Sequence, residues 1–177
     1  MLGLKYKIAD KLVLNKFRAA LGGKVRACSS GGSALSKEVG SFFCGIGITI
    51  IEGYGLTETS PVMTVGHSDF FKFGTVGKPI PGVEVKIQPD GEIVCRGHNV
   101  MMGYYKNEEA TNEAIIDGWF HSGDIGEFDE DGLLRITDRK KSLIVTSGGK
   151  NVAPQPMEVS LTSNKYIEQC NIVGDDR

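Results

Sequence analysis

The sequence predicts an α/β fold in which a parallel pair of strands precedes a small antiparallel β-region. The order strand, glycine loop, helix, strand, glycine loop between residues 25 and 59 is typical of a parallel pair. Strict alternation of apolar and polar side chains over residues 83–88 predicts a half-buried antiparallel strand. Glycine supplies 24 of the 177 residues without a collagen period, mostly in turns between these runs.

The first third of the chain contains helical and β-strand patterns in alternation. The expected elements are a helix over 6–21 that stops at Gly22–Gly23, a strand over 25–29, a helix capped by Ser33 or Ser36 that runs to about residue 45, and a buried strand over 48–52. Each strand runs directly into a glycine loop. Ligands bind beyond the carboxyl ends of parallel strands, so both loops are candidates for a binding site.

From about residue 70 the pattern changes to short strands. The expected elements are a hairpin of 83–88 with 92–96, a short helix capped by Asn107, strands over 119–120, 125–128 and 133–137, then a charged break at 138–141, a strand over 143–145, a turn at 147–150, a short helix after Pro154 and Pro156, and a strand over 168–173. No internal repeat is present.

The composition excludes several classes of protein. The net charge is −2, so no overall basic field favours nucleic acid. The four cysteines form no C-x-x-C pair, which disfavours a metal site and predicts reduced thiols in the cytoplasm. No apolar run is long enough for a transmembrane helix, and lysines interrupt any signal-peptide core. Membrane association through another part of a longer protein stays open.

Four motifs follow one another along the chain: YGLTET at 54–59, GTVGKPIPG at 74–82, GWFHSGDI at 118–125, and DRKKSLI at 138–144 followed by SGGKN at 147–151. Together they resemble the adenylate-forming enzymes, the AMP-dependent acyl-CoA synthetases, and most closely the long-chain fatty-acid–CoA ligases. The resemblance implies an ATP- and Mg²⁺-dependent ligase that converts a fatty acid to acyl-AMP and then, with coenzyme A, to acyl-CoA. A sibling ligase for another carboxylic acid and a non-catalytic nucleotide-binding module are the alternatives.

The resemblance assigns the phosphate chemistry to the loop after the second strand. Anionic groups must approach each other when a carboxylate attacks the α-phosphate of ATP, so hydroxyls and a metal ion have to be placed around it. Thr57 would offer its hydroxyl and Glu58 would hold Mg²⁺. Tyr54 would stack on adenine, and Gly53 and Gly55 would let the backbone approach. The alternative for Glu58 is an ordinary surface carboxylate.

The same resemblance assigns further nucleotide contacts. Gly31, Gly32 and Ser33 would line the adenine and acyl pocket, although a helix cap explains them too. Asp124 would accept two ribose hydroxyls, with a turn cap as its alternative. Arg139 would reach the ribose or phosphate, with a solvated linker charge as its alternative. His121 has no visible partner in the sequence and receives no role.

The resemblance also divides the chain. Residues 1–137 would end a large AMP-binding domain, α/β to about residue 70 and β-rich from 71 to 137. Residues 138–141 would form a hinge about Lys141, and 142–177 an incomplete C-terminal domain. Gly148 and Gly149 would line the pantetheine tunnel after the hinge rotates. The family's phosphate loop and catalytic lysine have no counterpart in these residues, so we expect the isolated chain to be inactive.

Overall fold

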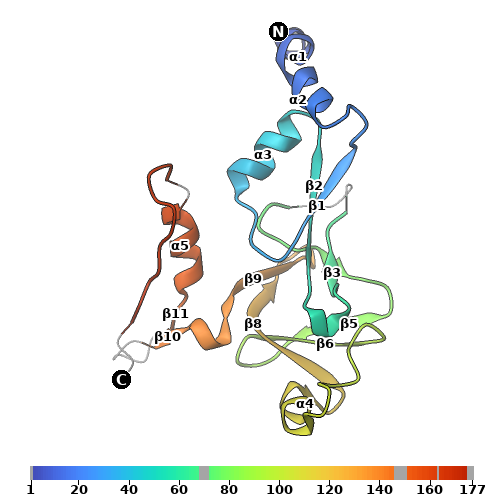
Figure 1. Cartoon of the computed structure of the whole chain (residues 1–177), viewed down its shortest axis with the longest axis vertical. Helices are drawn as coiled ribbons and strands as arrows, with labels where there is room; N and C mark the ends of the chain where they lie inside the picture. Colours follow the sequence, from blue (N-terminus) through green and yellow to red (C-terminus); the bar gives the residue numbers. More distant parts are fainter. Residues whose placement is uncertain (1, 68–71, 146–150, 163, 175–177) are drawn as a thin grey trace.

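The computed structural model describes residues 2–67, 72–145, 151–162 and 164–174 (Figure 1). The N-terminal part consists of α1 (Leu2–Ala9), the π-helical turn η1 (Asp10–Leu14), α2 (Asn15–Ala20), β1 (Ala27–Ser30), α3 (Lys37–Gly45), β2 (Thr49–Tyr54), the 3₁₀ turn η2 (Thr57–Thr59), β3 (Thr64–Val65) and β4 (Lys78–Pro79). These elements give the α/β fold that the sequence predicts.

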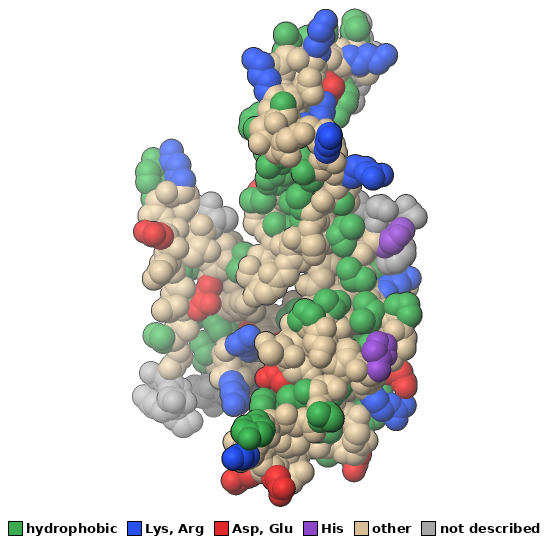
Figure 2. Space-filling view, turned by 45° about the vertical axis from the view of Figure 1, so that its right-hand side comes forward, with side chains coloured by type: hydrophobic (Ala, Val, Ile, Leu, Met, Phe, Trp, Pro, Cys, Tyr) green, Lys and Arg blue, Asp and Glu red, His purple; other side chains and the backbone are tan. Residues whose placement is uncertain are grey.

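The helix predicted over 6–21 is confirmed, although it begins earlier, at Leu2. It ends where Gly22 adopts a positive φ of 83° and the Gly23 N–H donates to the Arg18 carbonyl at 2.8 Å. Arg18 connects the helix to the end of α3 by donating a hydrogen bond to the Ile46 carbonyl at 2.7 Å. Figure 2 shows hydrophobic side chains among Lys and Arg side chains at this end of the molecule.

The parallel pair is confirmed. β1 and β2 pair in parallel from Ala27 opposite Thr49 to Ser30 opposite Glu52, with α3 packed against β2. Of the two candidate caps for α3, Ser36 is the one used, because its side chain accepts the Val39 N–H at 3.2 Å. β3 pairs antiparallel with β2, and β4 pairs antiparallel with β3 at the edge of the sheet.

The β-rich region forms a second sheet. It contains β5 (Val83–Ile87), β6 (Glu92–Gly97), β7 (Ile115–Ile116), β8 (Trp119–Phe128) and β9 (Leu134–Arg139), with α4 (Glu108–Ala114) between β6 and β7. The strand order is β5-β6-β8-β7, and β9 also pairs with β8. The hairpin of β5 with β6 and the Asn107 cap of α4 are confirmed.

The two strands predicted over 119–120 and 125–128 are wrong as separate elements, since they are one strand, β8. Gly123, which lies between the two expected strands, has a positive φ of 71°, and the register with β9 shifts between Ile125 and Gly126. β8 therefore continues past Gly123 as one irregular strand: β6 pairs with it from Phe120 to Ile125, and β9 from Asp124 to Phe128.

The last elements are the 3₁₀ turn η3 (Lys140–Ser142), β10 (Ile144–Val145), β11 (Asn151–Val152) and α5 (Pro154–Thr162). The strand predicted over 168–173 is wrong, because the structure forms no strand within residues 164–174. The Ile172 N–H donates to the Glu158 side chain at 2.8 Å, and Gly174 packs on Ile144. This segment is thus held by side chains where a strand would need a backbone ladder.

A small core joins the two sheets. Met63, Val83, Cys95 and Phe120 are buried together, and Tyr54 packs against them. The end of β2 is therefore fixed on the β-rich region. Among the described residues, no helix has the length and apolar character needed to cross a lipid bilayer.

Candidate functional site

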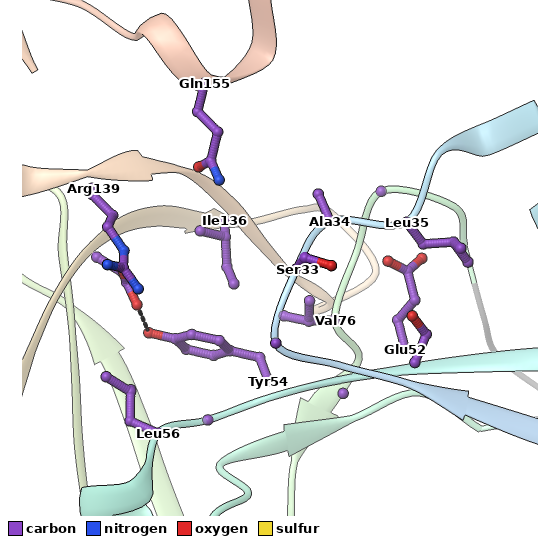
Figure 3. A pocket seen from close by; sticks show the side chains of 16 residues that line it. Ser33, Ala34, Leu35, Glu52, Tyr54, Leu56, Val76, Ile136, Arg139 and Gln155 are labelled. Carbon is purple, nitrogen blue, oxygen red and sulfur yellow. Dashed lines mark hydrogen bonds and ion pairs between the residues drawn. The ribbon is translucent and has the colours of Figure 1, made fainter. Parts of the chain in front are cut away.

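A pocket with a volume of about 220 Å³ lies where β1 and β2 end (Figure 3). Its walls come from both glycine loops, from the bend in β8, from β9 and from α5. The lining residues include Ser30, Gly32, Ser33, Glu52, Gly53, Tyr54, Gly55, Asp124, Arg139 and Gln155. Carboxyl ends of parallel strands and a strand of the second sheet thus meet at one cavity, as ligand sites in α/β sheets do.

Asp124 is the most constrained polar side chain of this pocket, with a side chain only 9 % exposed. The Tyr54 hydroxyl donates to its Oδ2 at 2.6 Å, and the Arg139 Nε lies 3.4 Å from its Oδ1. Figure 3 shows Tyr54 and Arg139 pointing toward each other, with Gln155 on the opposite side of the cavity from Tyr54. Arg139 is exposed apart from this contact, so it can move toward a ligand.

Tyr54 is held as a neutral donor. Its burial, and then its hydrogen bond to Asp124, raise the pKa of the Tyr54 hydroxyl far above its ordinary value of 10. The proton therefore stays on Tyr54, and the phenol orients the Asp124 carboxylate.

This shift predicts a pH dependence of stability. The folded pKa of Tyr54 exceeds the unfolded value, so its contribution is complete below pH 10 and is lost as the pH rises above 10. In urea titrations between pH 8 and 11, we expect the free energy of unfolding to fall more steeply for the unaltered chain than for Tyr54→Phe. Tyr166→Phe, at a side chain 83 % exposed, is the matched control and should keep the unaltered slope. Identical slopes for the unaltered chain and Tyr54→Phe would contradict this prediction.

Thr57 and Glu58 lie in η2, in a second, more open pocket that shares the glycine loops and Arg139 with the first. Thr57 is exposed, and Glu58 accepts the Tyr104 hydroxyl on its Oε1 at 2.9 Å. This contact raises the pKa of Tyr104. Within the described ranges no cluster of three potential metal ligands occurs. A single carboxylate such as that of Glu58 would suit Mg²⁺, which takes most of its ligands from phosphate and water.

Close neighbouring backbone leaves little room for a side chain at several glycines of the two loops. A Cβ on Gly55 would lie 1.8 Å from the Pro61 carbonyl oxygen, and one on Gly31 would lie 3.3 Å from the Gly53 carbonyl oxygen. Gly32 differs, because its φ is 82° and the space around it is open. These glycines let the loops approach one another at the pocket, and Gly53 also packs closely on Thr64.

Glu52 is a pocket residue that the sequence analysis missed. It lies at the end of the cavity near Leu35 (Figure 3). Burial raises the pKa of this carboxyl, while hydrogen bonds from the Leu35 and Gly74 backbone act in the opposite direction. The sequence does indicate this residue, because Glu52 is the charged residue that ends a β-branched, buried strand.

Comparison with known proteins identifies the family. Residues 4–105 match the AMP-binding enzymes. The chain belongs to the AMP-binding enzyme family.

Its relatives and structural neighbours agree with this assignment. The long-chain-fatty-acid–CoA ligase FadD15 of Mycobacterium tuberculosis is 51% identical over 175 residues, which cover 99% of this chain and 29% of the relative. The long-chain-fatty-acid–CoA ligase ACSBG2 of Xenopus laevis is 40% identical over 98% of this chain and 25% of its own length. The chain therefore spans less than a third of these relatives.

The fold matches a solved structure of this kind. The O-succinylbenzoate coenzyme A synthetase of Bacillus subtilis in complex with AMP superposes with a TM-score of 0.78 and 28% identity, over 92% of this chain and 37% of that one. The same enzyme in complex with ATP and a magnesium ion gives a TM-score of 0.74 at 30% identity, over 87% of this chain and 36% of that one.

In this AMP-binding enzyme the structure brings the predicted nucleotide residues together around adjoining pockets. The more open pocket alone is lined by Gly31, Thr57 and Glu58. The less open pocket alone is lined by Ser33 and Asp124. The remaining predictions are Gly32, Gly53, Tyr54, Gly55 and Arg139, which line both. Lys141 is exposed in η3, beyond the pocket. The predicted tunnel residues Gly148 and Gly149 lie outside the described residues.

His121 has a partner that the sequence did not reveal. Its Nδ1 lies 3.0 Å from Glu92 Oε2. Glu92 is 29 residues earlier in the chain and reaches His121 only because β6 pairs with β8. The expectation from the sequence that His121 has no partner is therefore wrong for the folded chain.

Proposed function

We propose that this chain supplies the ribose- and phosphate-binding surface and the interdomain hinge of an ATP- and Mg²⁺-dependent long-chain fatty-acid–CoA ligase. The whole protein would form acyl-AMP and then acyl-CoA. The observation that carries the proposal is Asp124, a buried carboxylate oriented by Tyr54 at the meeting point of two glycine loops and Arg139.

The predicted site residues contact different parts of the bound nucleotide and its metal ion. Asp124 accepts the two ribose hydroxyls, a task that suits the two oxygens of a carboxylate. The ring of Tyr54 and the glycine loops form a surface for adenine, and Ser33 lies beside it. Thr57 donates its hydroxyl to phosphate and Glu58 is the ligand for Mg²⁺, both at the open side of the site. Bound Mg²⁺ supplies neutralisation of charge on the phosphates. Arg139 moves from Asp124 toward the ribose or phosphate.

The acid and the thiol are assigned through the relatives. Several of the similar proteins are named as long-chain-fatty-acid–CoA ligases, at 40 to 51% identity. A structural neighbour is described with bound AMP, and with ATP and magnesium. The fatty acid and coenzyme A are therefore the proposed substrates. Residues 138–141 are the proposed hinge about Lys141, between a large domain ending at residue 137 and a C-terminal domain.

Nucleotide binding tests the proposal directly. In an NMR titration of the purified chain with AMP, we expect shifts of the Tyr54, Asp124 and Arg139 signals, with a dissociation constant between about 10 μM and 10 mM. Adenosine compared with adenine tests the contribution of the ribose, and adenine should bind more weakly. No shift at any of the three residues at 20 mM AMP, about twice the weakest expected constant, would overturn the proposal.

A second measurement addresses the acid. The whole protein with ATP, Mg²⁺ and coenzyme A should release pyrophosphate faster with palmitate than with benzoate. A preference for benzoate would instead favour a sibling ligase for aromatic acids. Absence of turnover with any acid, while AMP binds, would favour a non-catalytic nucleotide-binding module.

A further inference from the structure

Glu92, the first residue of β6, has an ionised side chain that is only 6 % exposed. Three donors meet it from two other segments. The Gly123 N–H donates to Oε1 at 3.0 Å, while His121 Nδ1 and Lys140 Nζ lie 3.0 and 2.9 Å from Oε2. A carboxylate buried to this extent has to be matched by such partners.

The contact through Oε1 concerns the residue next to Asp124. Gly123 has a left-handed backbone, and the β6–β8 ladder is irregular between Glu92 and Val94. Side chains replace the missing ladder contacts. Besides the bond from Gly123 to Glu92, Ser122 Oγ donates to the Ile93 carbonyl at 2.6 Å and accepts the Asp124 N–H at 3.1 Å. The bend that presents Asp124 to the pocket is therefore fixed from β6.

The contact through Oε2 concerns the start of the proposed hinge. Lys140 begins η3, directly before Lys141, and its Nζ also lies 2.7 Å from Asp90 Oδ2. The two carboxylates raise the pKa of Lys140, so its ammonium is retained. Burial raises the pKa of Glu92, but its bonds from His121, Lys140 and Gly123 outweigh this and lower it.

We propose that Glu92 is a positioning residue that connects the nucleotide site with the hinge. One oxygen holds Gly123 and thereby Asp124, while the other holds Lys140 and thereby the first turn of the hinge segment. A shift of η3 away from β6 removes a cation from the same carboxylate that orients the ribose-binding turn. The roles of the two connected segments, ribose binding and hinge, rest on the proposed function, but the coupling between the segments does not.

Amide hydrogen exchange of the ligand-free chain tests this coupling without any substrate. We expect Glu92→Gln to raise exchange about tenfold at Gly123 and Asp124 and also over residues 140–145, because the uncharged amide keeps one accepting oxygen where the carboxylate offers two. Lys140→Gln should raise exchange over 140–145 and, more weakly, at Gly123. Glu84→Gln is the matched control, since Glu84 is an exposed carboxylate on the neighbouring strand, paired with Arg96 at 2.8 Å. It should change neither region.

Kinetics of the whole protein supply the second readout. Glu92→Gln should raise KM for ATP about tenfold with a smaller change in kcat, whereas Lys140→Gln should leave KM for ATP within about twofold and alter the thioester-forming half-reaction. Equal exchange at Gly123 in Glu92→Gln and the unaltered chain would overturn the coupling. A lower melting temperature with unchanged exchange and KM would do so as well. Failure of the unaltered protein to use ATP would instead refute the proposed function and leave the exchange result valid.

Discussion

Asp124→Ala is expected to weaken AMP binding by about a hundredfold or more. The variant loses the two proposed charge-assisted hydrogen bonds to the ribose, each contributing roughly 1.5–3 kcal/mol. It also leaves the partly buried Tyr54 hydroxyl without its acceptor, the Asp124 Oδ2 at 2.6 Å. The measurement is the dissociation constant for AMP, by NMR titration or calorimetry on the purified chain.

The loss of binding has to be separated from a loss of folding. An unpaired buried hydroxyl costs about 1–3 kcal/mol, so Asp124→Ala should also unfold at lower urea. Adding Tyr54→Phe removes that orphaned group, and the double variant should regain part of the stability without regaining AMP binding. Asp131→Asn, an exposed carboxylate in the turn between β8 and β9, is the control for charge alone. If Asp124→Ala bound AMP as the unaltered chain does, Asp124 would be a structural cap.

Local patterns were sufficient to predict the two parallel strands at whose ends the pocket lies. The parallel pair of β1 and β2 followed from two apolar runs that each lead into a glycine loop, and it is present in the structure. Tyr54 and Asp124 were both candidates because of the motifs around them. Their contact, between residues 70 apart, could not be predicted, since it depends on how β8 bends at Gly123 beside the end of β2.

The misses share a physical cause. Glu92 and its partners are far apart in the sequence: the pairing of β6 with β8 brings Glu92 beside His121, and η3, which follows β9, brings Lys140 to the same carboxylate. The separate strands expected on either side of Gly123 were wrong because the ladder of β6 with β8 continues across an irregular stretch that contains this glycine. The strand expected over 168–173 was wrong because apolar residues alone do not provide a neighbouring backbone to pair with.

Replacing Lys141 with proline is expected to separate the two half-reactions of the whole protein. Lys141 is exposed in η3, which directly follows β9, so its side chain is not needed for packing. Proline fixes φ near −65° and removes the backbone N–H, which restricts the rotation that a hinge requires. If the adenylating arrangement is the resting one, ATP–pyrophosphate exchange should stay within about threefold of the unaltered rate, while transfer to coenzyme A slows by tenfold or more.

Lys141→Ala is the matched control, because it removes the same charge and keeps the backbone free. Lys141→Ala should keep the rates of both half-reactions within about threefold of the unaltered rates, which is the limit given for ATP–pyrophosphate exchange in Lys141→Pro. Thioester formation is measured from supplied acyl-AMP, so that a defect in the first half-reaction cannot affect the second. Equal losses in the two assays for Lys141→Pro would show that residues 138–141 are scaffold. Selective loss in Lys141→Ala as well would assign the effect to the ammonium group, and the freedom of the backbone at Lys141 would then have no part in the transfer step.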